Sequence, residues 1–509
     1  MLAKILSFGL LGIEAYPIEI EIDVSRGLPA VTVVGLADTA IRESKERVKS
    51  AIKNSGFDWP QERITISLAP SDIKKEGACF DLGIALGILA ATEQINSCRL
   101  KEFCVLGELS LDGQLRQIQG ALPIAISAAK YNLKKIILPQ ANAKEAGIAS
   151  DVFIWPLKSL KETVEFLNNP EFTPPLSIDR AALLQHDCDY SVDFCEVKGQ
   201  HSAKRAIEVA VSGGHNILMI GPPGSGKTML AKRIPTIMPD LTLKESLEIT
   251  KIHSVMGTLP LQQGIITLRP FRDPHHTISD IALIGGGSIP RPGEISLAHQ
   301  GVLFLDELPE FQRNCLEALR QPLEDGSIRI SRIIRSLLFP ASFMLACAMN
   351  PCPCGYYTDP RKHCRCNPNK IQNYIAKISG PLLDRIDIHI ELPSIQYKEL
   401  ADTKDAERSA AIKTRVEKTR LIQRERFRHE GIFYNARMNS RLIKKYCILD
   451  DGAKNLLRLA MTDLGFSGRA YDKILKVART IADMAGSEII LAEHISEAVQ
   501  YRNLDRQWA

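Results

Sequence analysis

No apolar stretch in this 509-residue sequence is long enough to cross a membrane. A transmembrane helix needs roughly 20 consecutive apolar residues, whereas the longest candidate, Leu82–Thr92, has 11 residues and is flanked by acidic residues. Lys4 and the apolar stretch Ile5–Ile13 resemble the start of a secretion signal, but Glu14 follows at once and no A-x-A cleavage site is present. We therefore expect a cytoplasmic protein with no membrane partner.

The sequence also lacks a charge excess that would identify a partner, because 64 basic residues face 59 acidic ones and the net charge is only +5. A charged fraction of 24% and a mean hydropathy of −0.06 exclude a disordered or fibrous chain. Twelve cysteines in a chain of this length, without a secretion signal, do not predict a disulfide framework. Four of them lie within 15 positions and require a different explanation.

At roughly 150 residues per domain, the length predicts about three domains. Residues 1–165 combine short apolar runs with helix-like stretches, which indicates an α+β fold. Residues 166–195 are proline-rich and have little periodicity, so we expect a linker. The expected strands of the first domain include Ile18–Val24, Ala30–Gly35 and Ile64–Leu68, and its expected helices include Thr39–Asn54 and Asp81–Ala91.

The second half of the chain predicts an α/β domain followed by helices. Residues 196–395 alternate strand-like and helix-like segments, as in a parallel sheet flanked by helices. Strand patterns end after residue 395, and residues 396–509 contain the long charged stretch Lys398–Arg428 and several amphipathic segments within Asn439–Tyr501. We expect these residues to form a helical insertion and a C-terminal lid.

A nucleotide-binding motif follows the apolar strand pattern Asn216–Ile220. The sequence G-x-x-x-x-G-K-[ST] between a strand and a helix binds phosphates, because its glycines let backbone N–H groups turn toward the oxygens. Lys227 would reach the β- and γ-phosphates of ATP, and the Thr228 hydroxyl would bind Mg²⁺. The predicted loop residues are Gly221, Pro222, Pro223, Gly224, Ser225, Gly226, Lys227 and Thr228.

A second apolar strand pattern, Gly301–Leu305, ends in two carboxylates. Asp306 is expected to complete the Mg²⁺ site, and Glu307 to orient and deprotonate the attacking water. Asn350 follows a third such pattern and could hold that water. Together these residues predict ATP hydrolysis.

Two arginines later in the chain could contact the phosphates of ATP. Arg385 lies in SGPLLDRID, where it could reach the γ-phosphate of an adjacent subunit in a ring, and Arg469 opens a helix that could fold back on the nucleotide. The alternative for each is an ordinary surface arginine.

The order of these motifs resembles the ComM/YifB family of magnesium-chelatase-like AAA+ ATPases. The resemblance implies an α/β P-loop core with a helical lid, and it implies that ATP and Mg²⁺ are used in a hexameric ring. It also implies helicase and branch-migration activity on single-stranded or branched DNA during natural transformation, with recombination proteins as partners. The stretches that carry it are GPPGSGKT, RPFRDPHHTISDIALIGGG, PRPGEISLAHQGVLFLDELPEF, AMNPCPCGYY, SGPLLDRID and SGRAYDKILKVARTIAD.

The first domain resembles the Lon-type protease domain in two stretches, Lys75–Asp81 and Gly107–Gly120. That family uses a serine activated by a lysine, but Cys79 stands at the serine position and Leu122 at the lysine position. A nucleophile without its base does not predict a protease. We therefore expect a degenerate Lon-like fold that serves assembly, DNA or a partner. The alternative is a lone Cys79 thiolate activated by a neighbouring lysine.

The clustered cysteines form a knuckle at residues 350–367. Four thiolates from two short arms suit a tetrahedral structural Zn²⁺ site, and the neighbouring His363 could replace one of them. The alternatives to a zinc site are four reduced free thiols or a redox-active cysteine pair. A loop fixed by a metal at this point would couple the strand that ends at Asn350 to the substrate of the ring. The four candidate ligands are Cys352, Cys354, Cys364 and Cys366.

Basic residues favour DNA as the substrate. The helix-like stretch Lys413–Arg428 has seven basic and two acidic residues, for which a solvated face is the alternative. Asp325-Gly326 is a turn signal before an expected β-hairpin. Asp273–His276 could hold a metal, but adjacent histidines usually point apart, and the family resemblance suggests substrate contact. The expected DNA-binding residues are Arg269, Arg272, Arg291, Arg329, Arg332 and Arg335.

Three other functions compete with the DNA motor. A magnesium-chelatase motor subunit of the chlorophyll pathway lacks a Lon-like first domain, which this chain has. A Lon-like protease is disfavoured by Leu122. A protein-remodelling ATPase of the MoxR type would hydrolyse ATP at a rate indifferent to DNA.

Overall fold

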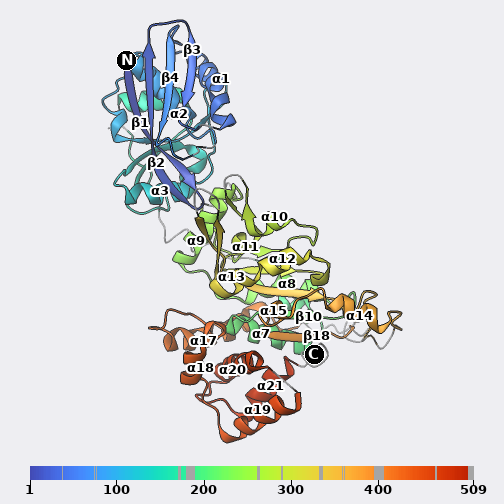
Figure 1. Cartoon of the computed structure of the whole chain (residues 1–509). Coiled ribbons are helices and arrows are strands. Elements are labelled where there is room, and N and C mark those ends of the chain that lie inside the picture. Colours follow the sequence, from blue (N-terminus) through green and yellow to red (C-terminus); the bar gives the residue numbers. More distant parts are fainter. Residues whose placement is uncertain are drawn as a thin grey trace. The chain divides into compact units, whose positions relative to one another are not determined.

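The structure is a computed structural model that describes residues 1–502 except 37, 74, 76, 170–172, 179–189, 261–263, 288–289, 332–335, 358, 360–361, 395–405 and 465–466. The chain divides into two compact units (Figure 1). Unit 1 contains Met1–Asp187 and Thr242–Thr267, and unit 2 contains Cys188–Leu241 and Leu268–Ala509. This division differs from the boundaries expected from composition, because residues 242–267 belong to the first unit and the C-terminal helices to the second.

Unit 1 is built on a seven-stranded mixed sheet with the strand order β3-β4-β2-β1-β5-β8-β9. Strand β2 pairs antiparallel with β1 and β4, and the other neighbours are parallel. Burial alternates along β2, where Ile18, Ile20 and Ile22 point into the core. The strands are β1 (Leu2–Leu11), β2 (Glu14–Ser25), β3 (Ala30–Val34), β4 (Arg63–Ala69), β5 (Cys104–Val105), β8 (Lys135–Pro139) and β9 (Phe153–Leu157), with a small hairpin of β6 (Glu108–Leu109) and β7 (Leu115–Arg116).

Helix α2 is buried over its whole length in unit 1. Gly83 and Gly87 allow this close packing, because a Cβ atom would lie 2.7 Å from Ile20 at the first position and 2.5 Å from Ile22 at the second. The two helices expected from the sequence are confirmed at their predicted bounds. In the order of the sequence, the helices of residues 1–168 are α1 (Thr39–Asn54), α2 (Asp81–Ala91), α3 (Ala121–Lys130), α4 (Ala143–Ala146) and α5 (Leu160–Asn168).

Helix α9 (Leu243–Met256) packs in unit 1, although it follows a helix of unit 2 in the sequence. It begins with a capping box between Thr242 and Glu245. Near its end the Ser254 carbonyl accepts a 3.1 Å hydrogen bond from the Gly120 N–H, and the Ser254 hydroxyl donates to the buried Glu145 carboxylate. This helix therefore anchors the segment 242–267 to the loop that precedes α3.

A five-stranded parallel sheet with the order β11-β14-β17-β10-β18 forms the centre of unit 2. Because all strands run in the same direction, their carboxyl ends meet at one edge, where ligands of open α/β sheets bind. The strands are β10 (Ile217–Ile220), β11 (Phe271–Arg272), β14 (Val302–Leu305), β17 (Met344–Met349) and β18 (Ile388–Glu391).

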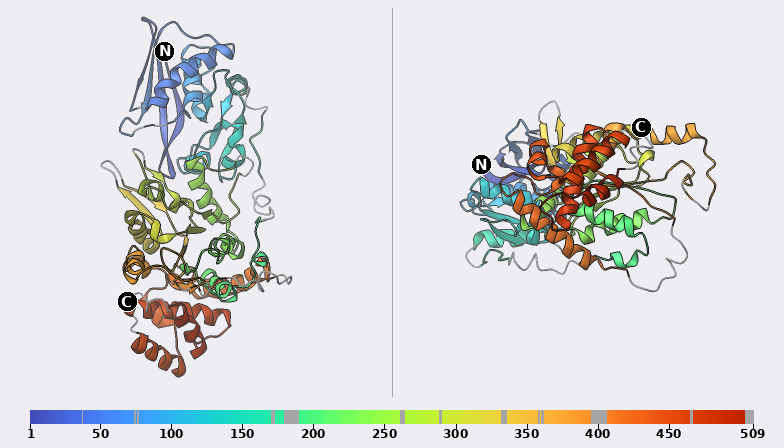
Figure 2. Two further views of the ribbon diagram at one scale, coloured as in Figure 1. Left: turned by 90° about the vertical axis from the view of Figure 1, so that its right-hand side faces the viewer. Right: turned by 90° about the horizontal axis from the view of Figure 1, so that it is seen from below.

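One hydrophobic cluster joins this sheet to α7, α8 and the C-terminal helices. Figures 1 and 2 show those last helices, in red, gathered in a single bundle within unit 2. Of the expected charged stretch Lys398–Arg428, residues 409–426 form helix α17, and residues 398–405 lie outside the described residues. These helices are α7 (His201–Gly213), α8 (Lys227–Ile237), α17 (Ser409–Arg426), α18 (Ser440–Tyr446), α19 (Asp451–Leu464), α20 (Gly468–Met484) and α21 (Ala492–Gln500).

Short elements between the core strands complete unit 2. The expected hairpin is present as β15 (Ser327–Ser331) and β16 (Ser336–Pro340), which pair antiparallel. Gly326, with φ +65°, ends helix α13 and directly precedes β15, where the sequence places the turn before the hairpin. The remaining elements are α10 (Asp280–Ile284), β12 (Gly285–Gly286), β13 (Arg291–Pro292), α11 (Glu294–Leu297), α12 (Arg313–Ala318), α13 (Arg320–Asp325), α14 (Pro368–Ile375) and α15 (Gly380–Leu383).

Within the residues that the structure describes, no helix combines the length and the apolar character needed to span a bilayer.

Candidate functional site

The loop between β10 and α8 is shaped by its glycines. Gly224 and Gly226 have φ values of +78° and +90°, which residues with side chains rarely adopt. A Cβ on Gly221 would lie 2.5 Å from the Leu392 carbonyl oxygen. The Ser225 hydroxyl is buried and has no hydrogen-bond partner among the described residues. A loop with these features, at the N-terminus of an 11-residue helix, suits a phosphate group.

Lys227 lies inside this loop and is only 8% exposed. Its ammonium donates to the carbonyls of Gly221 at 2.7 Å and Pro222 at 3.0 Å, and to the Asn350 side-chain oxygen at 3.2 Å. Burial lowers the pKa of Lys227 despite two nearby carboxylates. The predicted phosphate-binding lysine and the predicted asparagine at the end of β17 therefore meet in the structure.

Thr228 and Asp306 form the second contact of the site. The Thr228 hydroxyl donates to Asp306 Oδ2 at 2.7 Å, and the Glu307 N–H donates to Asp306 Oδ1 at 2.9 Å. A hydroxyl and a carboxylate offer the hard oxygen ligands that Mg²⁺ prefers. The donor set thus fits a nucleotide-bound Mg²⁺, as the sequence predicts.

Glu307 adopts a left-handed backbone conformation with φ +54°, and its side chain is 53% exposed. Non-glycine residues in this conformation are concentrated at functional sites. His276 Nδ1 lies 3.5 Å from Glu307 Oε2, and the His276 ring packs edge-on against Phe311. The sequence analysis assigned His276 to substrate contact and missed this neighbour. The signal was available, because β11 ends four residues before His276 and pairs with β14, which leads to Glu307.

The two candidate sensor arginines lie near each other at helix α15. Arg385 forms an ion pair with Glu324 and donates to the Pro381 carbonyl at 2.5 Å. Arg469, from the start of α20, donates to Asp384 at 2.8 Å. Within the described residues, neither guanidinium forms a hydrogen bond or ion pair with the phosphate-binding loop. The structure therefore places both arginines at helix α15, through Pro381 and Asp384.

A buried network joins the lid helix α20 to strand β18. His215 Nδ1 lies 3.1 Å from Asp387, and His215 Nε2 lies 2.9 Å from the Thr480 hydroxyl. Burial opposes ionisation of Asp387, but the charge of Lys473 and the hydrogen bond from His215 prevail and hold the pKa of Asp387 well below its usual range. This network fixes α20 against the core.

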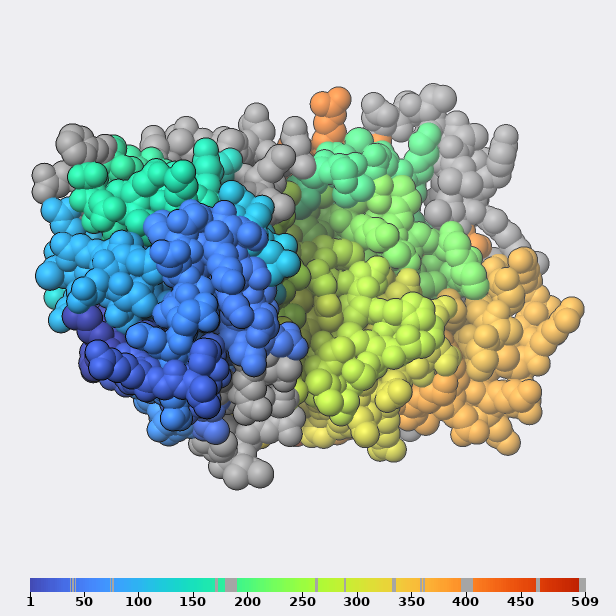
Figure 3. Space-filling model, turned by 90° about the horizontal axis from the view of Figure 1, so that it is seen from above, coloured from blue at the N-terminus to red at the C-terminus, as the bar shows by residue number. Residues whose placement is uncertain are grey.

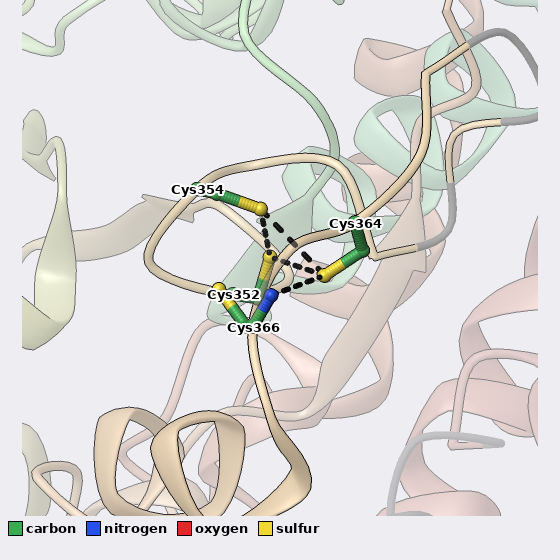
Figure 4. Close-up of side chains that lie close together, drawn as sticks. All are labelled: Cys352, Cys354, Cys364 and Cys366. Carbon is green, nitrogen blue, oxygen red and sulfur yellow. Dashed lines mark hydrogen bonds between the residues drawn. The ribbon is translucent and has the colours of Figure 1, made fainter.

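The four knuckle cysteines converge, as the close-up shows (Figure 4). Their sulfur atoms all lie within 4.8 Å of one another. The Cys352 sulfur is 3.3 Å from that of Cys354 and 3.7 Å from that of Cys364. Tetrahedral Zn²⁺ with Zn–S bonds of about 2.3 Å places its sulfurs about 3.8 Å apart. The cluster therefore has the size of a zinc site.

The electrostatics of the knuckle also favour a cation. Backbone N–H groups of Arg365 and Tyr356 lower the pKa of Cys354 to about 6. The N–H of Cys366 favours the Cys364 thiolate, but burial and the adjacent sulfurs raise the pKa of Cys364 to about 12. A divalent metal among the four sulfurs would stabilise their thiolate forms against the repulsion between them.

The knuckle touches the phosphate-binding loop. Gly355 has φ +84°, and a Cβ there would lie 2.7 Å from Pro223 Cδ and 3.9 Å from Asn350 Cγ. The cysteine cluster and the nucleotide site are therefore in direct contact.

Two of the six arginines expected to bind DNA are used by the fold instead. Arg269 is 8% exposed and donates to the backbone carbonyls of Pro239 at 2.5 Å and Gln300 at 2.7 Å. Arg272 forms a bidentate pair with Glu294. The exposed arginines of this set are Arg291 and Arg329, whereas Arg332 and Arg335 lie outside the described residues.

The cationic helix α17 is also partly neutralised within the chain. Lys413 pairs with Asp240, and Arg415 pairs with Glu208 and Glu407. For the exposed charges of α17 that remain, a solvated face stays the alternative to contact with DNA.

The surroundings of Cys79 do not favour a thiolate at the Lon-like nucleophile position. Burial, together with the charge of Asp81, raises the pKa of Cys79 to about 12. Leu122 is fully buried in α3, and the Lys75 ammonium donates to the Pro70 carbonyl. Lys74 lies outside the described residues. A partly buried thiol with a leucine at the position of the base agrees with a degenerate protease fold.

Three family models cover most of the chain. The model described as magnesium chelatase, subunit ChlI, matches residues 193–400. The one described as subunit ChlI of Mg-chelatase matches residues 20–142, and the one for the ChlI C-terminal region matches residues 406–502. The second unit and its lid are therefore similar to a magnesium-chelatase AAA+ domain.

Individual relatives extend this similarity over the full length. The competence protein ComM of Haemophilus influenzae is 44% identical over 99% of this chain and 98% of its own length. The uncharacterized protein YifB of Escherichia coli is 44% identical over 97% of this chain and 96% of its own length. An archaeal Lon protease from Thermococcus kodakarensis is 25% identical over 26% of this chain and 22% of its own length. The chain therefore belongs to the ComM/YifB family of magnesium-chelatase-like AAA+ proteins.

Proposed function

We propose that this protein hydrolyses ATP and uses the energy to move along DNA. The observation that carries the hydrolysis is the 2.7 Å contact between Thr228 and Asp306, next to Lys227 held by Asn350 at 3.2 Å. These four side chains come from α8, β14 and β17 and meet at the carboxyl edge of the parallel sheet. Such a set serves phosphoryl transfer in P-loop ATPases.

Each side chain has a role set by its chemistry. Thr228 and Asp306 would hold Mg²⁺, which neutralises charge on the phosphates. Lys227 would exchange its carbonyl partners for phosphate oxygens, since its ammonium already lies inside the loop. Glu307 would accept the proton of the attacking water, and Asn350 would orient that water.

We propose that the protein forms a ring, in which Arg385 acts on the nucleotide of an adjacent subunit. A guanidinium supplied from a neighbour stabilises the charge that develops in the transition state. Among the described residues Arg385 bonds to the Pro381 carbonyl and to Glu324 and makes no bond to its own phosphate-binding loop, which agrees with action in trans. We take the ring to be a hexamer that works on cytoplasmic DNA.

The DNA substrate rests on the relatives and on surface charge. ComM of Haemophilus influenzae is named a competence protein, and competence concerns the uptake of DNA. Arg329 is exposed on strand β15, where it could neutralise a phosphate without reading sequence. We propose branch migration of recombination joint molecules during natural transformation, in concert with recombination proteins.

We also propose that the knuckle holds a structural Zn²⁺ through Cys352, Cys354, Cys364 and Cys366. The support is the packing of the four sulfurs within 4.8 Å of one another. Elemental analysis of the purified protein should find about one zinc per chain, and no bound metal would contradict the site.

The DNA motor is tested with a labelled synthetic four-way junction, ATP and Mg²⁺. Wild-type protein should separate the arms, and Lys227→Ala should not. Glu307→Gln serves as a second control, because it should retain ATP binding and lose turnover. A junction left intact by wild type, with an ATPase rate that no DNA changes, would contradict the DNA motor and favour a protein or porphyrin client.

A further inference from the structure

The knuckle presents basic and aromatic side chains to solvent. Its segment, light orange in the space-filling view, lies on the surface of unit 2 (Figure 3). Tyr357 is 56% exposed, and Lys362 and Arg365 are exposed as well. Residues 350–367 contain three lysines and arginines and one aspartate, a net charge of +2 with histidine neutral, and of these Arg361 lies outside the described residues. The sequence of the knuckle is therefore cationic, on a chain whose overall charge is only +5.

The cysteine cluster brings the aromatic and basic arms of this surface together. The N–H groups of Tyr356 and Arg365 both hydrogen bond to the Cys354 sulfur. The Lys362 ammonium lies 4.6 Å from the centre of the Tyr356 ring and 3.3 Å from its hydroxyl. The backbone of both arms of the loop is therefore tied to the Cys354 sulfur, and Lys362 packs on the Tyr356 ring. We call the two tyrosines and the two basic residues of these arms the knuckle face (Tyr356, Tyr357, Lys362 and Arg365).

The geometry points to the knuckle face as a binding surface for single-stranded DNA. An exposed aromatic ring can stack on a base only where that base is unpaired, because the bases of a duplex already stack on each other. Lysine and arginine beside the ring neutralise the phosphates of the same strand. This inference rests on the proposed DNA motor and deepens it by naming the form of the strand and the residues that hold it.

The knuckle face lies next to the phosphate-binding loop, so bound DNA and bound nucleotide would be close to each other. Gly355 precedes the two tyrosines and packs against Pro223 of the phosphate-binding loop. A strand stacked on Tyr357 would therefore be held by the segment that touches this loop. We expect occupancy of the knuckle face to change the affinity for ATP.

The test measures binding of a fluorescent oligothymidylate and of a duplex by the full-length protein at several salt concentrations. Tyr357→Ala should weaken single-strand binding roughly tenfold, whereas Tyr357→Phe should stay within about twofold because the ring remains. Lys362→Ala and Arg365→Ala should each reduce the slope of log affinity against log salt by about 0.7, the value for one phosphate contact on a single strand. Lys53→Ala, an exposed lysine of α1, is the matched control and should bind as wild type.

Folding of each variant is checked by its zinc content and circular dichroism. If Tyr357→Ala, Lys362→Ala and Arg365→Ala bind single-stranded DNA with wild-type affinity and salt slope, the inference is overturned. If wild type binds no strand and DNA leaves its ATPase unchanged, the proposed function fails instead. The two failures are thus distinguishable.

Discussion

His276 Nδ1 lies 3.5 Å from Glu307 Oε2, at the carboxyl ends of two neighbouring strands of unit 2. Glu307 is held in a left-handed backbone conformation with φ +54°. A carboxylate that is 53% exposed has many rotamers, and a single imidazole neighbour restricts them. His276 is therefore placed to orient the carboxylate that would deprotonate water.

Replacing His276 should slow turnover without weakening ATP binding. We expect His276→Ala to lower kcat about tenfold, since a poorly positioned base loses part of the 10²–10⁴-fold that general base catalysis supplies. The KM for ATP should stay within about twofold, because His276 is not part of the phosphate-binding loop. Steady-state ATPase kinetics measure both.

Two further variants separate positioning from structure. His276→Asn retains a polar group and should recover part of kcat. His275→Ala removes a ring that bonds to Thr277 and whose centre lies 4.1 Å from that of the His276 ring. It removes no direct neighbour of the Glu307 carboxylate and should lower kcat less than His276→Ala. Equal losses in both alanine variants would contradict a specific role for His276.

A subunit that retains Arg385 should restore ATP hydrolysis by a neighbouring subunit that carries Arg385→Ala. Subunits with Arg385→Ala retain an intact phosphate-binding loop, and subunits with Lys227→Ala retain Arg385. If the guanidinium acts in trans, each variant alone should be inactive, while a mixture should regain a measurable fraction of the wild-type ATPase rate. A mixture as inactive as its components would show that Arg385 acts within its own subunit or only through its pair with Glu324.

The nucleotide site was predictable because its residues are close in sequence to strand ends. Lys227 and Thr228 follow β10, Asp306 and Glu307 follow β14, and Asn350 follows β17. In a parallel sheet these ends meet at one edge. The convergence of Thr228 and Asp306 therefore follows from the order of the strands, without knowledge of side-chain geometry.

Other features depend on contacts that no local pattern encodes. The assignment of α9 to unit 1 results from its hydrogen bonds to Gly120 and Glu145, more than 100 residues earlier. The burial of Arg269 depends on carbonyls at Pro239 and Gln300 that its own neighbours do not reveal. A cationic residue near a motif predicts charge, but only the fold decides whether that charge reaches solvent.

Asp81 should make unit 1 less stable as the pH rises through the mildly acidic range. Burial, opposed by the ion pair with Arg47, raises the pKa of Asp81 from 3.8 to about 6. The folded chain then binds a proton that the unfolded chain has already lost. The unfolding free energy therefore falls between these two values, by an amount on the order of 2–3 kcal/mol, and stays low above them.

Asp81→Asn tests this contribution, because the amide cannot ionise. Unfolding in urea is followed by the fluorescence of Trp59 and Trp155, which both belong to unit 1. The variant should lose the part of the pH dependence that lies between 3.8 and about 6. A wild-type profile unchanged by the substitution would assign that pH dependence to other groups.

Loss of the proposed knuckle metal should impair the nucleotide site, because Gly355 packs directly on Pro223. We expect Cys352→Ser to lose its zinc and to raise the KM for ATP severalfold, since Cys352 is fully buried beside Asn350, the partner of Lys227. Cys98→Ser, at an exposed cysteine of unit 1, is the matched control and should change neither value. A Cys352→Ser protein with wild-type ATPase kinetics and DNA binding would show that the knuckle does not communicate with the loop, even if it binds zinc.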